Sequence, residues 1–150
     1  MFGIIFYDPK NTENVGTALR SAYLYNADVF IIIGQREHVQ RVLKQGSNTY
    51  KAHHHIPTLF FNSWEQFQES FSRDGVKLVA IELATSSISL PSFKHPKNAM
   101  YVFGNERNGI PKDVLSQCDH IVQIPAVRPP GSFNLSTACS ITLYDRFAKL

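Results

Sequence analysis

Residues 99–111 read Ala-Met-Tyr-Val-Phe-Gly-Asn-Glu-Arg-Asn-Gly-Ile-Pro, and this stretch decides the fold. Its first five residues, Ala99–Phe103, form an apolar run of the kind that parallel strands show when both of their faces are buried. Gly104 follows, and then an amide and a carboxylate, Asn105 and Glu106. Open α/β sheets bind ligands just outside the carboxyl ends of their strands. The stretch therefore predicts a ligand site at the end of this strand.

Similar apolar runs recur along the chain and alternate with helical segments. The predicted strands are Phe2–Tyr7, Val29–Ile33, Thr58–Phe61, Lys77–Leu83, Ala99–Phe103 and His120–Ile124. Apolar spacing and turn signals predict helices around Val15–Ala22 and over Val39–Lys44, Ser63–Phe71, Pro111–Cys118 and Asn134–Lys149. This alternation predicts an α/β fold, with a mostly parallel sheet and helices on both of its faces.

Composition narrows the class of protein further. The 150 residues suffice for one domain, and 43% hydrophobic and 18% charged residues are ordinary for a globular protein. No apolar run approaches the roughly 20 residues of a membrane span, and the N-terminus resembles a strand more than a signal peptide. Cys118 and Cys139 are expected to be buried free thiols of a cytosolic protein. The net charge of +3 permits a polyanionic partner without requiring one.

A first polar cluster lies in the first predicted helix, where Gly16 and Arg20 are four residues apart on one face. Because helical side chains lean toward the N-terminus, Arg20 is expected to run back over Gly16 toward Asn14. That would place a guanidinium at a helix start, which is a preferred position for anions. The alternative is a solvated arginine, with Asn14 acting as the helix cap.

A second polar cluster precedes the last predicted helix, which follows Ile124 and a proline-rich loop. Ser132, Asn134 and Ser136 crowd the helix start, so one of them is expected to cap it while the others face a ligand. The helix itself is apolar around most of its circumference, which predicts a partner subunit as well as the sheet. Residues 53–55 are three histidines. Adjacent side chains alternate between the two sides of a strand, so the three cannot all face one metal ion. A solvated or RNA-facing loop is expected there and no metal site.

Taken together and in this order, the clusters resemble the SpoU/TrmH branch of the SPOUT-class RNA methyltransferases. The family's motifs are Asn-x-Gly-x-x-x-Arg, then Phe-Gly-x-Glu-x-x-Gly, then Ile-Pro followed by a Ser-x-Asn-x-Ser segment. The matching residues are Asn14, Gly16, Arg20, Phe103, Gly104, Glu106, Gly109, Ile124, Pro125, Ser132, Asn134 and Ser136. The resemblance covers residues 1–150 as a single domain with no extra RNA-binding domain, as in the family's minimal members, some of which modify the tRNA wobble nucleotide.

The resemblance implies an α/β knot, a deep trefoil in the C-terminal part, and S-adenosylmethionine as the cofactor, with no metal. It also implies a cytoplasmic homodimer whose active site lies at or near the subunit interface. Gly104 is expected to let the chain approach the cofactor closely. The implied cofactor-binding residues are Ile81, Leu83, Phe103, Gly104, Asn105, Ile124, Ser132 and Leu135.

The implied reaction is methyl transfer to a ribose 2′-hydroxyl of RNA, with tRNA expected before rRNA. A non-catalytic RNA- or nucleotide-binding module is the alternative from another class. The implied catalytic residues are Arg20, Asn14, Glu106, Ser132 and Asn134, with Glu106 anchoring the site by pairing with Arg20 or with an amide. Further phosphate contacts are expected from Lys94, His95, Lys97, Arg107, Lys112 and Arg128. The chain departs from many relatives at Arg128, where they carry glycine.

Overall fold

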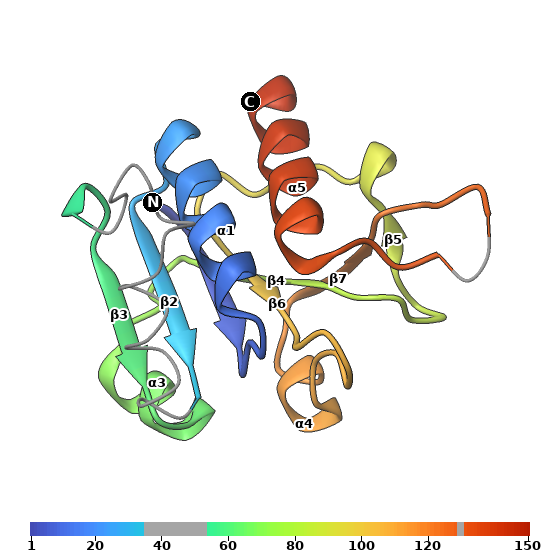
Figure 1. The fold of residues 1–150 in the computed structure, drawn as a ribbon. Helices are drawn as coiled ribbons and strands as arrows, with labels where there is room; N and C mark the ends of the chain where they lie inside the picture. Colours follow the sequence, from blue (N-terminus) through green and yellow to red (C-terminus); the bar gives the residue numbers. More distant parts are fainter. Residues whose placement is uncertain (35–53, 129–130) are drawn as a thin grey trace.

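The computed structural model describes residues 1–34, 54–128 and 131–150 (Figure 1). The helix predicted over Val39–Lys44 lies outside the described residues, as does His53. Within those ranges, no helix has the length and apolar content that a membrane span requires.

The described strands form one sheet in the order β3-β2-β1-β6-β4-β7-β5, and every pairing in it is parallel. This confirms the predicted mostly parallel sheet. The strands are β1 (Phe2–Tyr7), β2 (Val29–Ile33), β3 (Thr58–Phe61), β4 (Lys77–Ile81), β5 (Ile88–Ser89), β6 (Ala99–Phe103) and β7 (His120–Gln123).

Strand boundaries differ from the prediction at two places, and one short strand was not predicted. β4 ends at Ile81, two residues earlier than expected, because the carboxylate of Glu82 turns to accept hydrogen bonds from the backbone of Leu83 and Ile110. β7 ends one residue early, at Gln123. β5 has two residues, too few for a periodic pattern in the sequence to reveal a strand. Among the described residues it pairs with β7.

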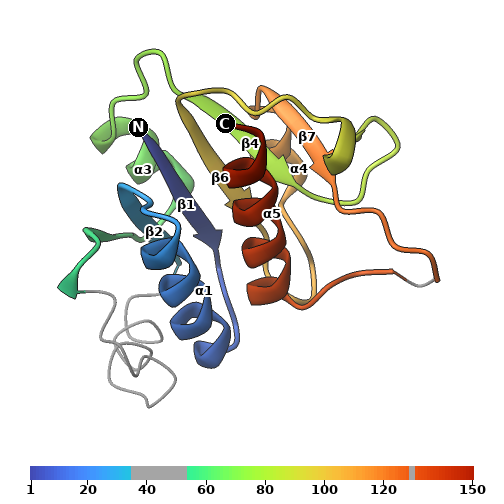
Figure 2. The same ribbon diagram turned by 90° about the horizontal axis from the view of Figure 1, so that it is seen from above.

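Helices cover both faces of the sheet, as predicted (Figure 2). On one face α1 (Thr12–Leu24) and α5 (Leu135–Lys149) lie side by side and bury one hydrophobic core against the strands. On the other face α3 (Trp64–Ser70) and α4 (Lys112–Leu115) contribute Trp64, Phe67 and Val114 to a second core. Successive side chains of the central strands point to opposite faces of the sheet, so these strands contribute to both cores.

The helix starts follow local hydrogen bonding. Asn11 caps α1, since its side chain accepts from Glu13 N, so the alternative that Asn14 is the cap is wrong. Ser63 caps α3 by accepting from Gln66 N, as the capping-box spacing predicts. Pro111 is the cap of α4 and not its first turn, and α4 ends at Leu115, three residues before the predicted end.

The strand order reverses at the centre of the sheet. From β1 the chain proceeds through β2 to β3 on one side, whereas β6, β4, β7 and β5 lie on the other. The segments that follow β1 and β6 therefore leave neighbouring strands at the same edge and diverge. Such a switch point opens a crevice in which α/β proteins place ligands.

Candidate active site

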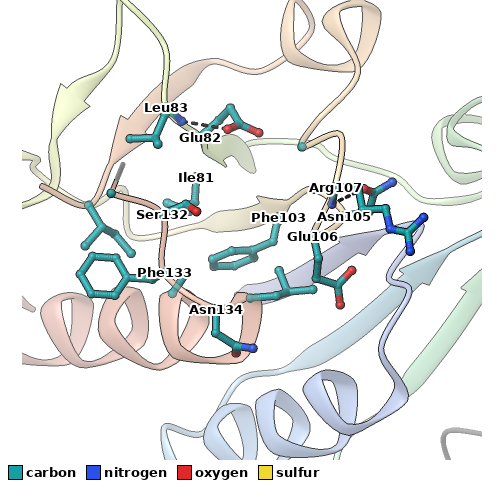
Figure 3. Close-up of a pocket in the computed structure, with 16 residues that line it drawn as sticks. Ile81, Glu82, Leu83, Phe103, Asn105, Glu106, Arg107, Ser132, Phe133 and Asn134 are labelled. Carbon is teal, nitrogen blue, oxygen red and sulfur yellow. Dashed lines mark hydrogen bonds between the residues drawn. The ribbon is translucent and has the colours of Figure 1, made fainter. Parts of the chain in front are cut away.

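A cavity of about 410 Å³ opens at the carboxyl ends of β4, β6 and β7 (Figure 3). This volume falls in the range of small-molecule sites. Its lining contains every residue that the resemblance assigns to the cofactor, together with Glu106, Asn134 and others. The lining residues are Ile81, Glu82, Leu83, Phe103, Gly104, Asn105, Glu106, Arg107, Gly109, Ile124, Gly131, Ser132, Phe133, Asn134, Leu135 and Ala138.

One wall of the cavity is the loop that follows β6, and the loop is held by its own backbone and side chains. Asn105 and Gly109 exchange two backbone hydrogen bonds, of 3.3 and 3.0 Å. The Oδ1 atom of Asn105 accepts from Arg107 N at 2.9 Å and from Asn108 N at 2.7 Å. The side-chain oxygen of Asn105, a predicted cofactor-binding residue, is therefore engaged in shaping the loop.

Gly104 lines the cavity, but the reason for a glycine differs from the expected one. A Cβ atom at this position would collide with the backbone of Gly109 and Ile110. The close approach is thus between two parts of the chain itself, and no ligand is needed to explain it. Glycine here allows the loop to fold back tightly onto the end of β6.

Glu106 fastens this loop to the start of α1. Its Oε2 atom accepts from Lys10 N at 2.9 Å, and its Oε1 atom accepts from Asn11 N at 3.1 Å and from Asn14 Nδ2 at 2.8 Å. Burial alone would raise the pKa of Glu106, but these hydrogen bonds outweigh it and hold the pKa below its ordinary value. The predicted pairing of Glu106 with an amide is observed, in the contact with Asn14.

Asn134 extends the hydrogen-bonded chain to the start of α5. Its Nδ2 atom donates to Asn14 Oδ1 at 2.9 Å, while Asn14 donates onward to Glu106. Figure 3 shows Asn134 and Glu106 directed toward the start of α1, from opposite sides of the cavity mouth. Glu106 and Asn134 lie 92 and 120 positions from Asn14 in the sequence, and both contact its side chain. Asn14 is buried at this junction.

The three polar residues at the start of α5 follow the prediction in part: one of them caps the helix, but of the other two only Ser132 faces the cavity. Asn134 caps the helix by accepting from Ser136 N and Thr137 N. Ser136 is buried, and its hydroxyl donates to the same Asn134 oxygen, so it does not face the cavity. Ser132 is exposed and lines the cavity.

Arg20 lies exposed on α1 and is not part of the cavity lining as far as the described residues define it. The Asn14 side chain, toward which Arg20 was expected to run, bonds to Glu106 and Asn134. The catalytic role assigned to Arg20 stays a prediction.

His95 is wrong as a phosphate contact. Its side chain is fully buried, with Nδ1 2.6 Å from the Tyr101 hydroxyl and Nε2 2.8 Å from Asp145 Oδ2. Lys94 and Lys97 are exposed but precede β6, at the opposite edge of the sheet from the cavity. Arg107 lines the cavity, and it is the lining's one positively charged side chain among the described residues.

Glu82 was not predicted, although it lines the cavity and bridges two of its walls. Its Oε1 atom accepts from Leu83 N and its Oε2 atom from Ile110 N, each at 2.9 Å. The available signal was a carboxylate near the end of an otherwise apolar run, inside the predicted strand Lys77–Leu83.

Both cysteines are free, as predicted. Burial raises the pKa of Cys118 to about 11 and raises that of the fully buried Cys139 as well, so neither is a reactive thiolate. Among the described residues, no cluster of three or more His, Cys, Asp or Glu side chains could hold a metal ion.

Comparison with known proteins assigns this chain to a family. Residues 1–144 match the SpoU rRNA Methylase family, and the chain belongs to it. A relative from Archaeoglobus fulgidus, described as an uncharacterized tRNA/rRNA methyltransferase, is 29% identical over 94% of this chain and 62% of its own. A putative TrmH family tRNA/rRNA methyltransferase from Staphylococcus saprophyticus is 27% identical over 93% of this chain and 55% of its own. The chain thus spans little more than half the length of these relatives.

Solved structures share the fold. An AdoMet-bound rRNA methyltransferase from Sinorhizobium meliloti superposes with a TM-score of 0.84 at 22% identity, over 99% of this chain and 56% of the other. A protein described for the 2-OH methylation of C/U34 on tRNA superposes with a TM-score of 0.83, also at 22% identity, over 99% of this chain and 95% of the other. The second resembles this chain in length as well as in fold.

Proposed function

We propose that this protein is an S-adenosylmethionine-dependent RNA methyltransferase that transfers a methyl group to a ribose 2′-hydroxyl, with tRNA as the substrate. The observation that carries the proposal is the hydrogen-bonded chain from Asn134 through Asn14 to Glu106, which joins all three sequence motifs beside one cavity. Membership of the family and the relatives described as tRNA/rRNA methyltransferases support it.

The cavity suits the cofactor in size and in chemistry. Its aliphatic and aromatic floor, from Ile81, Phe103, Ile124 and Leu135, matches the flat apolar faces of a nucleoside base. Its charged lining side chains are two carboxylates, Glu82 and Glu106, and the guanidinium of Arg107. A net negative lining favours a ligand that carries a sulfonium cation. We assign the cofactor to the residues named by the resemblance, from Ile81 to Leu135.

S-adenosylmethionine supplies an activated methyl group on a sulfonium sulfur, so the chain's own residues have to position the ribose and manage one proton. Asn14, fixed on both sides by Asn134 and Glu106, orients the ribose or Arg20. Arg20 binds the RNA phosphate and stabilises the alkoxide that develops at the 2′-oxygen. Guanidinium does not deprotonate in proteins, so a phosphate oxygen or the Ser132 hydroxyl relays the proton of the 2′-hydroxyl to solvent water.

The assembly we propose is a homodimer in the cytoplasm, with the C-terminal part threaded as an α/β knot. The exposed apolar side chains of α1 and α5 support the dimer, because α5 is buried against the sheet on one side only. Arg20 lies exposed on α1, one of these two helices, so a second subunit is the natural source of the guanidinium at each cavity. The other macromolecular partner that we propose is the RNA substrate.

The test measures methyl transfer from labelled S-adenosylmethionine to bulk tRNA and, separately, to rRNA, by the wild type and by Arg20→Ala. We expect methylation of tRNA, resistance of the product to alkaline cleavage at the modified nucleotide, and a loss of about 10²-fold or more in Arg20→Ala, as for other transition-state charge contacts. Ser132→Ala reports on the proton acceptor in the same assay.

Each alternative has its own outcome. Methylation of rRNA alone would replace the substrate class and leave the reaction standing. Binding of the cofactor without methylation of any RNA would favour the non-catalytic module. Equal turnover by the wild type and Arg20→Ala would remove Arg20 from the mechanism.

A further inference from the structure

We propose that Glu82 is a positioning residue, a carboxylate tether that holds the loop Gly104–Ile110 against the end of β4 and thereby gives the cofactor cavity its shape. This inference rests on the proposed function for the identity of the cofactor. The tether itself rests on contacts within the chain alone.

The tether joins two neighbouring strands at the point where both have ended. Glu82 follows β4, and its Oε2 atom accepts from Ile110 N at 2.9 Å, at the far end of the loop that follows β6. Its Oε1 atom accepts from Leu83 N at 2.9 Å, which turns the chain out of β4. One side chain therefore fixes both segments that line this side of the cavity.

Gly109 is shaped to receive the same carboxylate. It has a φ of +67°, and a Cβ atom there would collide with Glu82 Oε2 and with the side-chain carboxyl carbon. Side chains other than glycine are strained at such a φ regardless of space. The Glu82 carboxylate occupies the space that a side chain at position 109 would need. The motif glycine and the carboxylate therefore form a specific contact.

The loop has a second anchor at Glu106, which bonds to the start of α1. Glu82 and Glu106 thus hold the loop from two sides, with Asn105 closing it in between. Without Glu82, the Ile110 amide, in a residue only 6% exposed, would lose its acceptor. A buried unpaired N–H is costly, so the loop would open to hydrate it, and the cavity wall would move.

The experiment follows the tether through a readout that needs no cofactor. Hydrogen exchange is measured for the amides of 104–110 in the wild type, Glu82→Ala and Glu82→Gln. Calorimetry gives the affinity of each for S-adenosylmethionine and S-adenosylhomocysteine. We expect Glu82→Ala to speed exchange at Ile110 about tenfold or more and to weaken binding of both ligands about tenfold, as the loss of one charge-assisted hydrogen bond predicts. Glu82→Gln retains one acceptor oxygen and should lie between.

Asp119→Ala is the matched control. Asp119 also accepts a backbone N–H of β4, from Leu78 at 2.8 Å, and it pairs with Lys77, but at the strand's other end. Its loss should reduce stability while leaving exchange in the loop and ligand affinity within about twofold, because changes at distant sites without shared partners act independently.

Gly109→Ala tests the contact from the opposite side and stands even where Glu82→Ala fails to fold. Alone it should also weaken binding. In the double variant with Glu82→Ala, the fold-loss of ligand affinity should be smaller than the product of the two single losses. The added Cβ atom then no longer meets the Glu82 carboxylate, and only the backbone strain at position 109 is left.

Unchanged loop exchange in Glu82→Ala or Glu82→Gln would overturn the tether, as would fully multiplicative effects in the double variant. Loosened exchange with unchanged affinity would overturn its role in shaping the cavity. A wild type that binds neither ligand would instead refute the proposed function, and the exchange result alone would then decide on the tether.

Discussion

At the residue scale, Asn134 combines a structural and a functional contact in one side chain. Its Oδ1 atom accepts from Ser136 N, Ser136 Oγ and Thr137 N, which caps α5. Its Nδ2 atom donates to Asn14, which passes the hydrogen bond on to Glu106. The chain of amides is directional, because an amide oxygen only accepts and an amide nitrogen only donates. Substitutions can therefore separate the two contacts.

Asn134→Asp keeps a capping oxygen and removes the donor. We expect it to retain most of the free energy of unfolding, whereas Asn134→Ala loses about 1 kcal/mol with the cap. In Asn134→Asp an acceptor faces an acceptor at Asn14 or, if the Asn14 amide flips, at Glu106, so methyl transfer should fall more than stability does. Urea denaturation and the methylation assay measure the two effects. Full activity in Asn134→Asp would contradict a role for the chain of amides.

Arg107 is expected to contact an RNA phosphate. Its guanidinium lies at the cavity on a loop fixed by Asn105, and the loop's anchors leave this side chain exposed. Arg107→Ala should weaken RNA binding and lower the slope of log Kd against log salt by about 0.7, the value for one phosphate of a single strand. Lys97→Ala removes the same charge at the opposite edge of the sheet and should leave the slope unchanged. Cofactor affinity should not change in Lys97→Ala, because Lys97 does not line the cavity.

Sequence reasoning identified Asn14, Glu106 and Asn134, because motif spacing carries polar residues whose types suit one another. It did not predict why Gly104 is a glycine or that Glu82 takes part. Both depend on which loop folds back against which strand end, and that is decided by sheet order. The local sequence around Glu82 and around Ile110 does not indicate that these two residues are within hydrogen-bond distance of each other.

At the element scale, the last turn of α5 is fastened to the segment before β6 by buried polar side chains. Arg146, 7% exposed, donates to the carbonyls of Pro96 and Lys97, each at 2.7 Å. His95 bridges the Tyr101 hydroxyl and Asp145. The helix was predicted from its apolar residues, but this anchor was not, since its partners lie about 50 positions away.

This anchor predicts a loss of stability in mild acid. Burial lowers the pKa of His95 and outweighs the hydrogen bond that the imidazole donates to the Asp145 carboxylate, while the charges of Lys149 and Arg146 lower the pKa further. The unfolded histidine has a pKa of about 6.5, so the unfolded chain binds the proton more readily than the folded one. Stability present above that pH is therefore lost as the pH falls through 6.5 toward the lowered folded value. The groups facing the imidazole are Tyr101, Asp145, Arg146 and Lys149.

Urea denaturation of the wild type and His95→Gln between pH 7.5 and 5 measures this effect. The wild type should lose about 1.4 kcal/mol for each unit by which its folded pKa is lowered, while the variant, less stable at neutral pH, should change little. Parallel pH profiles for the two proteins would contradict the assignment to His95.

At the scale of the whole molecule, alternating strands and helices predicted the parallel sheet and its two covered faces, but not the order of the strands. Apolar runs such as Val29–Ile33 and Ala99–Phe103 are equally buried. Nothing in their local sequence therefore indicates which position each strand takes in the sheet. Order follows from the crossovers, including the placement of β6 beside β1, which brings Glu106 to Asn14. The candidate site is thus a product of the topology.

The surface of α1 and α5 yields the last prediction, on assembly. We define the helix patch as the exposed apolar side chains of these helices and their ends, namely Tyr23, Leu24, Tyr144, Phe147 and Leu150. Leu24, Phe147 and Leu150 are 68–70% exposed, which is unusual for side chains of this size that lie close together. The Tyr25 and Phe147 rings, 5.9 Å apart, connect the two helix ends. Large exposed apolar patches are typical of interfaces between proteins.

Tyr144→Glu with Phe147→Glu should convert a dimeric wild type to monomers in light scattering after gel filtration, because two carboxylates from each copy would be buried unpaired at a two-fold interface. Leu59→Glu, on the edge strand β3 and outside the helix patch, is the control and should stay dimeric. If Arg20 reaches the partner's cavity, the monomer should also lose methyl transfer while retaining cofactor affinity. A monomeric wild type would contradict the dimer, and an active monomer would confine each site to one chain.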